Sequence, residues 1–298
     1  GDNLLTDMYT TPKEAKEYLA ATGVDALAVA IGSAHGVYKT KPKLSIDRLR
    51  EIRAAVDAPL VLHGGSGLSD EDFRHSIREG MAKVNIFTDL CLAGQRAMAG
   101  EVYKVCRDGG RLLCQAPTGI GKSMSVLFPA LKSMGNESVG PIFYLTARGT
   151  TRAAAENALA ILRDTEPELH LRSVTLTAKD KICLCETREC TPEACPYANG
   201  YYARIKDALW DMLDVPCLTA ETLQEYAERH TVCPFELGLD SSLWSDVIIG
   251  DYNYLFDPVV HLVRFFESAG DYIFLVDEAH NLPGRAREMH SAALTKTS

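Results

Sequence analysis

The chain contains 298 residues, of which 46% are hydrophobic and 24% are charged. This length and composition are typical of a globular protein with room for about two domains, and they exclude low complexity and general disorder. The formal net charge of −9 argues against a nonspecific polybasic binder, although a local basic groove could still hold nucleic acid. No apolar run approaches the roughly 18 residues of a transmembrane helix. No signal-type segment follows Gly1, so we expect a cytoplasmic protein with no membrane partner.

Helix-like and strand-like patterns alternate along the first ninety residues. Helical patterns cover residues 12–21, 45–56 and 69–80, and apolar strand patterns cover residues 25–31, 59–63 and 83–87. The strands are apolar throughout instead of alternating, which is typical of parallel strands covered on both faces. A polar or Gly-rich loop follows each strand, as at the active-site edge of a (β/α) barrel. Ser69 and Asp72 predict a helix N-terminus after the second loop, where a phosphate can bind.

Three loop motifs carry a resemblance to a known family: AHG at residues 34–36, LHGGSG at 62–67 and NIFT at 85–88. From about residue 6 to about residue 92 the chain resembles the C-terminal part of class II fructose- or tagatose-bisphosphate aldolases. The resemblance implies a Zn²⁺ ion that polarises the ketone of a ketose bisphosphate as a Lewis acid. The implied residues are the zinc ligands His35 and His63, the phosphate-binding Gly36, Gly64, Gly65 and Ser66, and Asn85 to Thr88 around the dihydroxyacetone-phosphate part.

The resemblance covers only part of such an enzyme. A barrel of this type needs roughly 250 residues, and about a third of that is here. The half that carries the family's remaining zinc-ligand His and its catalytic Asp is absent, and two His do not make a three-ligand catalytic zinc site. We therefore expect no aldolase turnover from this chain alone. A ketose bisphosphate becomes a substrate only if another chain supplies the missing half.

From about Gly94 the pattern changes, and a nucleotide-binding motif follows. A helical pattern runs through Val105 to a predicted strand at residues 111–114, then to the Gly-rich loop QAPTGIGKS. Such a loop cradles phosphates with backbone N–H groups, while its Lys reaches the β/γ-phosphates and its Ser binds Mg²⁺. Ala116 stands where the strict pattern has Gly, so the match is to the helicase variant. The predicted ATP contacts are Gln115, Thr118, Gly119, Gly121, Lys122 and Ser123.

An acidic pair at the end of a second strand supports the same chemistry. Residues 272–276 form a buried-strand pattern that ends in Asp277-Glu278. Alone, such a pair is more often a solvated loop. Together with the upstream P-loop it predicts an ATPase, with Asp277 binding Mg²⁺ and Glu278 orienting or activating the attacking water.

Five of the nine cysteines crowd into residues 183–217. Zinc ribbons show paired Cys knuckles at both ends of the site, and that spacing is not present here. Three near cysteines and one distant one suit an iron–sulfur cluster of the [4Fe–4S] type better. The predicted ligands are Cys183, Cys190, Cys195 and Cys233, and Cys185 could replace Cys183. Zinc and a set of free thiols are the alternatives.

From about Gly94 to its end, the chain resembles the XPD-like and DinG-like iron–sulfur DNA helicases. The motifs are QAPTGIGKS, YLTARGTTR (144–152), the four cysteines, IIGDYNYLFDP (248–258) and VDEAH. The family translocates 5′→3′ on single-stranded DNA and unwinds forked duplex. By resemblance, His280 joins Lys122, Asp277 and Glu278 as a catalytic residue and couples the ATP state to the strand. The residues implied at the DNA are Thr146, Arg148, Thr150, Tyr252 and Tyr254. The two tyrosines could stack on bases or be structural residues with satisfied hydroxyls.

The predicted fold is α/β in two parts. A partial (β/α) barrel covers residues 1–92, and a P-loop, RecA-like helicase domain covers residues 93–298, with an iron–sulfur insertion at about 178–238. The chain stops before a second motor domain, so we expect ATP binding, slow hydrolysis and no unwinding. No Pro/Gly/Ser-rich linker marks the junction at about 90–98, which suggests a chimeric or misjoined reading frame. The alternatives are a lyase completed by another chain and a noncatalytic ATP- and DNA-binding module.

Overall fold

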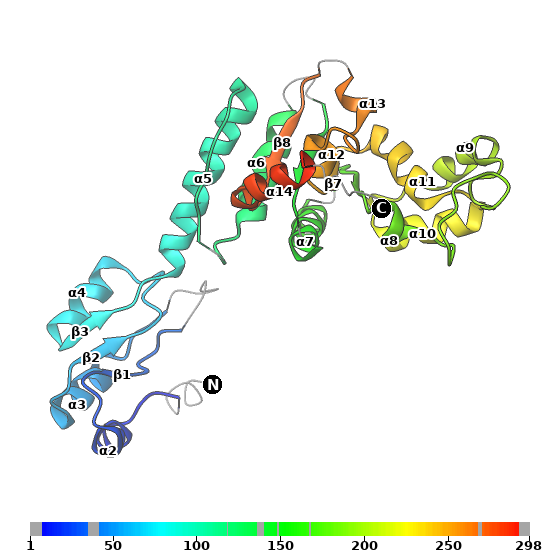
Figure 1. The fold of residues 1–298 in the computed structure, drawn as a ribbon. Coiled ribbons are helices and arrows are strands. Elements are labelled where there is room, and N and C mark those ends of the chain that lie inside the picture. Colours follow the sequence, from blue (N-terminus) through cyan, green and yellow to red (C-terminus); the bar gives the residue numbers. More distant parts are fainter. Residues whose placement is uncertain are drawn as a thin grey trace, which may run out of the picture. The chain divides into compact units, whose positions relative to one another are not determined.

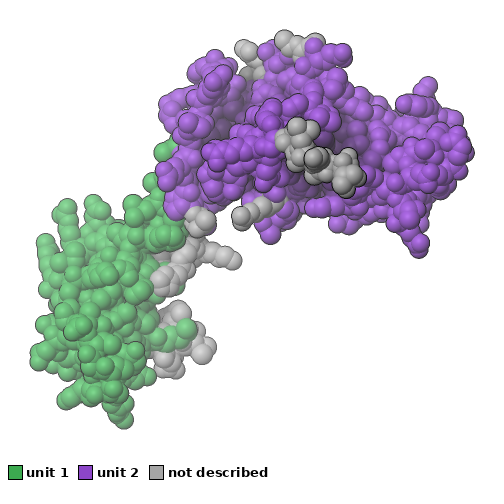
Figure 2. Space-filling view, viewed as in Figure 1, with its two compact units in different colours: residues 1–97 green, residues 98–298 purple. Residues whose placement is uncertain are grey.

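The computed structural model describes residues 8–34, 42–117, 119–135, 140–147, 149–166, 168–267 and 270–291. The chain divides into two compact units, residues 1–97 (unit 1) and residues 98–298 (unit 2), coloured separately in Figure 2. None of the helices in the described ranges combines the length and the apolar character that a membrane span requires.

Unit 1 contains a parallel three-stranded sheet with its connecting helices (Figure 1). The elements are α2 (Pro12–Thr22), β1 (Leu27–Ala28), α3 (Ile46–Ala55), β2 (Leu60–Leu62), α4 (Asp70–Arg78), β3 (Met81–Val84) and the start of α5 (Thr88–Asp108). The strand order β1-β2-β3 follows the chain order, so each connection crosses from one parallel strand to the next. The three predicted helices and the first two predicted strands are confirmed, although these strands are shorter. The third strand begins two residues before the predicted segment and already ends at Val84. Closure into a partial barrel remains a prediction.

Local capping and burial explain why these segments of unit 1 fold. The Ser69 side chain accepts a hydrogen bond from the Asp72 N–H, and Asp72 bonds back to the Ser69 N–H, which is the predicted capping box. Leu49 and Ile52 of α3 are fully buried against Leu60 and Leu62 of β2 in one apolar core. Burying such side chains contributes about 1.5–3 kcal/mol each.

Unit 2 is built on a five-stranded parallel sheet of order β6-β5-β7-β4-β8. Its strands are β4 (Ile142–Leu145), β5 (Ser173–Thr175), β6 (Cys217–Leu218), β7 (Val247–Gly250) and β8 (Ile273–Val276). Both central strands, β4 and β7, are buried along their whole length. Since all strands are parallel, the residues that follow β4, β7 and β8 meet at one edge of the sheet.

Helices cover both faces of this sheet. The elements are the rest of α5, α6 (Lys122–Met134), α7 (Gly149–Thr165), α8 (Lys179–Ile182), α9 (Tyr201–Asp211), α10 (Ala220–His230), α11 (Pro234–Ser241), η1 (Ser242–Trp244), α12 (Asn253–Phe256), α13 (Val263–Phe266), η2 (Ala279–Asn281) and α14 (Leu282–Met289). Alternate β4 residues point to opposite faces: Tyr144 packs in a core with α6 and α7, and Phe143 packs in a core with α8 to α13.

The segment predicted as an iron–sulfur insertion is less separate than expected. Within residues 178–238, the strand β6 pairs with β5 and so becomes part of the main sheet. The buried side chains of α8 to α11 share one apolar core with Phe143, Val174 and Ile248 of the sheet. Helix α9 begins at Tyr201 directly after Gly200, whose φ of +66° places it in the left-handed region.

The strand predicted at residues 111–114 is wrong. Those residues form no strand pairing within the described part of the chain, and Leu113 is 95% exposed. Gly109 and Gly110, with φ of +75° and +131°, end α5 and redirect the chain before the apolar stretch begins. An apolar run becomes a strand only where it pairs with the N–H and C=O groups of a neighbouring strand, and residues 111–114 join neither of the two sheets in the described part of the chain.

Candidate functional site

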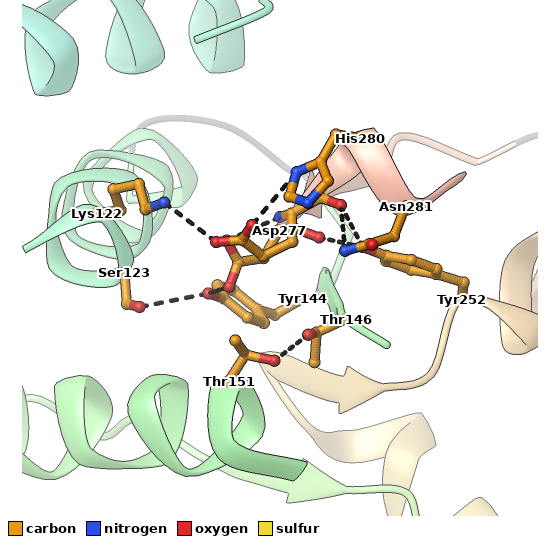
Figure 3. Close-up of polar contacts among 10 residues, drawn as sticks. Lys122, Ser123, Tyr144, Thr146, Thr151, Tyr252, Asp277, His280 and Asn281 are labelled. Atoms are coloured by element: carbon orange, nitrogen blue, oxygen red, sulfur yellow. Dashed lines mark hydrogen bonds and ion pairs between the residues drawn. The ribbon is translucent and has the colours of Figure 1, made fainter. Parts of the chain in front are cut away.

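Three segments of unit 2 meet at the carboxyl edge of the larger sheet: the start of α6, the end of β4 and the turn after β8 (Figure 3). Lys122 is the first residue of α6, and its Nζ lies 3.2 Å from Glu278 Oε1. The two side chains are about 30% exposed, so water and a ligand can reach the pair. The preceding Gly121 has φ of +77°, which a residue with a side chain adopts only with strain. The ion pair therefore joins the predicted phosphate-binding Lys to the predicted water-orienting Glu.

A tyrosine hydroxyl joins the other two predicted nucleotide-site residues. The Tyr144 hydroxyl donates a hydrogen bond to Asp277 Oδ2 at 3.0 Å, and Ser123 Oγ lies 3.4 Å from the same hydroxyl. Asp277 Oδ1 accepts the Glu278 N–H at 3.0 Å. Burial raises the pKa of Tyr144 well above its usual value, so the hydroxyl stays protonated and remains a donor at neutral pH.

The backbone at Glu278 is held in a conformation that non-glycine residues rarely adopt. Its φ is +52°, in the left-handed region, which costs about 1–2 kcal/mol. The Tyr252 hydroxyl donates to the carbonyl oxygens of Asp277 and Glu278, the latter at 3.1 Å, and Asn281 Nδ2 donates to the Glu278 carbonyl at 3.2 Å. These bonds offset the strain, and the turn carries Glu278 Oε2 to 3.3 Å from Nδ1 of the exposed His280.

The remaining predicted ATP contacts lie in the loop before α6. Gln115, Gly119 and Gly121 are exposed, so a ligand could reach their backbone N–H groups. Gly119 has φ of +81°, as this tight loop requires. Thr118 lies outside the described residues.

The residues predicted at the DNA differ from one another in exposure. Thr150 is exposed near the start of α7, whereas Thr146 is buried and hydrogen-bonded to Thr151. Tyr252 is fully buried and Tyr254 is 6% exposed. Because neither ring presents a face on which a base could stack, the structure favours the alternative interpretation, in which they are structural tyrosines. Arg148 lies outside the described residues.

Several polar contacts at this edge were not predicted from the sequence. Asp251 Oδ2 lies 3.6 Å from Arg152, and Asp251 Oδ1 accepts a 3.1 Å bond from Arg285, so this carboxylate ties α7 to α14. Tyr144 and Asn281 were also missed as site residues. Tyr144 lies inside a motif that the sequence analysis quoted, but only the register of β4 shows which way its hydroxyl points.

The predicted cluster cysteines are partly gathered. Cys185 Sγ lies 3.9 Å from Cys195 Sγ, and Cys183 is the next neighbour of Cys185. The pKa of Cys185 is raised to about 11, mainly by burial and to a smaller extent by the nearby thiols of Cys195 and Cys183. Cys190 and Cys233 both interact electrostatically with Lys179. Within the described ranges, no three His, Cys, Asp or Glu side chains are already arranged to hold a metal ion. The thiols are nonetheless the donors that iron–sulfur clusters take.

The Gly-rich loop of unit 1 packs against its neighbours through backbone contacts. A Cβ added at Gly64, which has φ of +67°, would lie 2.2 Å from the Ala34 carbonyl oxygen, so only glycine fits. The Gly65 N–H donates to the Asn85 carbonyl at 3.0 Å. Asn85 Nδ2 lies 3.3 Å from His63 Nε2. The loops that follow β2 and β3 are therefore joined at the predicted sugar-phosphate site.

Ser66, in the loop after β2, contacts the start of α5, to which Thr88 belongs. The buried Ser66 Oγ accepts the Asp89 N–H at 3.1 Å, and Thr88 is the first residue of the helix. The Asp89 carboxylate accepts the Gly67 N–H at 2.9 Å. His35 and Gly36, the other predicted zinc and phosphate residues, lie outside the described residues.

Comparison with known proteins separates the chain into two resemblances. The sequence model of the class-II fructose-bisphosphate aldolase family matches residues 2–137, and that of the DEAD_2 family matches residues 164–298. The uncharacterized protein YdjI of Escherichia coli (strain K12) is 50% identical over 90 residues, which make up 30% of this chain and 32% of that protein. The chain thus spans about a third of the length of this curated relative.

Two solved structures also align with parts of the chain. The crystal structure of the YdjI aldolase from Escherichia coli K12 aligns over 43% of this chain and 45% of its own, with 39% identity and a TM-score of 0.29. An XPD helicase structure aligns over 65% of this chain and 33% of its own, with 20% identity and a TM-score of 0.47. The N-terminal part of the chain resembles the class II aldolases, and the C-terminal part resembles the XPD-like helicases.

Proposed function

We propose that this chain, in which an aldolase-like segment is joined to an XPD-like helicase segment, acts through unit 2 as an ATP-dependent motor on DNA. One observation carries the proposal. Lys122 and Ser123 at the start of α6 meet Asp277 and Glu278, which follow β8, at one edge of a parallel sheet. This is where ligands bind to open α/β sheets.

Each site residue would have a different role in ATP hydrolysis. Lys122 would leave Glu278 for the β/γ-phosphates, because a nucleotide triphosphate carries more negative charge than one carboxylate. Ser123 Oγ and Asp277 are the hard oxygen ligands that would hold Mg²⁺, which neutralises charge on the phosphates. The Glu278 carboxylate, freed from Lys122, would orient the attacking water and accept its proton.

The DNA and cluster assignments complete the proposal. Single-stranded or forked DNA, traversed 5′→3′, is the partner that the helicase resemblance implies, and the exposed Thr150 at the start of α7 is a candidate phosphate contact. Cys183, Cys190, Cys195 and Cys233 would hold a [4Fe–4S] cluster, with Cys185 as the alternative to Cys183. Two observations support this: the spacing of these cysteines, and the 3.9 Å approach of Cys185 Sγ to Cys195 Sγ.

Exchange of Lys122 for Ala tests the nucleotide site. The variant is expected to bind a fluorescent ATP analogue roughly ten- to a hundredfold more weakly, since a hydrogen bond to a charged group contributes about 1.5–3 kcal/mol. It is also expected to lose the phosphate release that single-stranded DNA stimulates in the unmodified chain. Lys132→Ala is the matched control, because Lys132 lies exposed on the same helix α6. Equal affinity in all three proteins would contradict the proposal.

A second candidate function concerns unit 1, and the contact between His63 and Asn85 favours it. Aldol cleavage of a ketose bisphosphate, with Zn²⁺ on His63 and His35 and the missing half supplied by another chain, is the activity that the aldolase resemblance implies. Zinc-loaded chain is expected to keep less bound zinc after His63→Ala than after His75→Ala, since the half-exposed His75 lies on α4. The measurement is zinc per chain by elemental analysis, with triose-phosphate release assayed alongside. Equal zinc in the two variants would remove His63 from the site.

A further inference from the structure

The Tyr144 hydroxyl lies between the two groups that would ligate Mg²⁺ in the nucleotide site. It donates to Asp277 Oδ2 at 3.0 Å and lies 3.4 Å from Ser123 Oγ (Figure 3). We propose that Tyr144 is a positioning residue, which holds the Asp277 carboxylate oriented toward Ser123 so that Mg²⁺ binds with the nucleotide. The inference rests on the proposed ATP site and deepens it.

The position of this hydroxyl is fixed by the centre of the sheet. Tyr144 lies on β4, where it is paired in register with Ile249 of β7 on one side and with Leu275 of β8 on the other. Its side chain is 1% exposed and packs with Leu127 of α6 and Leu159 of α7. A ring confined in this way cannot turn its hydroxyl elsewhere without disturbing two strands and two helices.

Asp277 depends on that hydroxyl for its orientation. The Asp277 N–H is bonded to the Leu145 carbonyl at 2.9 Å, which fixes the backbone. The carboxylate has two bonds that fix its rotation: Oδ1 accepts the Glu278 N–H, and Oδ2 accepts the Tyr144 hydroxyl. Loss of the second bond leaves only the Oδ1 bond to restrain the carboxylate, which then has more freedom about its side-chain torsions. Hydrogen bonds to metal-ligating carboxylates typically contribute about ten- to a hundredfold to metal affinity.

The Tyr144 hydroxyl is expected to strengthen Mg²⁺ binding, because it is a neutral donor to the Asp277 carboxylate. A protonated tyrosine orients the carboxylate but neither removes its charge nor adds one, so it leaves Asp277 able to bind a cation. Without the hydroxyl, part of the free energy of Mg²⁺ binding is used to order the Asp277 and Ser123 side chains, and the affinity for Mg²⁺ falls.

Tyr144→Phe tests the proposal, because phenylalanine keeps the buried ring and removes only the hydroxyl. Binding of a fluorescent, nonhydrolysable ATP analogue to the whole chain is measured while Mg²⁺ is titrated, and again in EDTA. We expect the Mg²⁺ midpoint to rise about tenfold, with affinity in EDTA unchanged within twofold. Tyr272→Phe is the matched control, since the half-buried Tyr272 donates to the Phe265 carbonyl at 2.9 Å, away from the site. Its Mg²⁺ midpoint is expected to equal that of the unmodified chain.

Three outcomes overturn the inference, and they differ from one another. If the unmodified chain binds no nucleotide at any Mg²⁺ concentration, the proposed function fails and this inference fails with it. If the unmodified chain binds but Tyr144→Phe has an unchanged Mg²⁺ midpoint, only the positioning role of Tyr144 is wrong. If both variants bind the ATP analogue more weakly, and by the same factor in EDTA as in Mg²⁺, the Tyr144 hydroxyl contributes to folding and does not position the Mg²⁺ ligand Asp277.

Discussion

Replacement of Glu278 by Gln is expected to lower the rate of DNA-stimulated ATP hydrolysis by about 10²- to 10⁴-fold. Glutamine keeps the length and most of the hydrogen bonds of the side chain, but it cannot accept the proton of the attacking water. Nucleotide binding is expected to persist or strengthen, since Lys122 then loses the ion pair that holds it 3.2 Å from Glu278 Oε1. Phosphate release and equilibrium binding of a fluorescent analogue, measured on the same preparations, separate the two effects.

Glu288→Gln provides the comparison for that experiment. Glu288 lies on α14 with 72% of its side chain exposed, and its carboxylate lies 3.3 Å from Arg285, outside the nucleotide site. The hydrolysis rate of this variant should equal that of the unmodified chain. If Glu278→Gln hydrolyses ATP within threefold of the unmodified rate, Glu278 is not the residue that activates water.

Replacement of Cys195 by Ser is expected to remove the cluster from anaerobically purified chain. The unmodified chain should contain about four irons and show a broad visible absorbance, because a [4Fe–4S] cluster is held by four thiolates. Cys195 is the buried member of the group and lies 3.9 Å from Cys185. Its hydroxyl replacement is a poor ligand for iron, so iron per chain should fall close to zero. Elemental analysis for iron and zinc, with the visible spectrum, measures the outcome.

The other cysteines make the cluster experiment specific. Cys217→Ser is the control, since Cys217 lies on strand β6 and outside the predicted ligand set. Cys183→Ser and Cys185→Ser decide which of the two neighbouring thiols is a ligand. Only removal of the ligand should lower the iron content per chain. Zinc in place of iron in the unmodified chain would favour a zinc–cysteine site, and absence of both metals would leave the cysteines as free thiols.

Motif spacing predicted most of the candidate site but misplaced some of its neighbours. Lys122, Ser123, Asp277 and Glu278 were named from the Gly-rich loop and from the acidic pair after a strand, and they do lie together. The apolar stretch at residues 111–114 has the composition of a strand, yet it forms none, because composition does not supply a neighbouring strand with which to pair.

The tyrosines show a different failure of motif-based reasoning. Tyr252 was named as a candidate for base stacking, but its ring is fully buried and its hydroxyl holds the strained turn at Glu278. Tyr144 was not named for any role, yet it contacts two site residues. A tyrosine can bury its ring and satisfy its hydroxyl or expose its ring to a ligand, and residue type alone does not distinguish these states.

Sequence by itself determined the features that depend on contacts within a few residues: the capping box of Ser69 with Asp72, the three helices predicted in unit 1 and the loop that opens α6 at Lys122. Only the tertiary structure decided that Lys122 faces Glu278, 156 positions away, and that the Tyr144 hydroxyl reaches Asp277. The physical reason is the register of β4 between β7 and β8. A shift of one residue would turn the Tyr144 hydroxyl to the opposite face of the sheet.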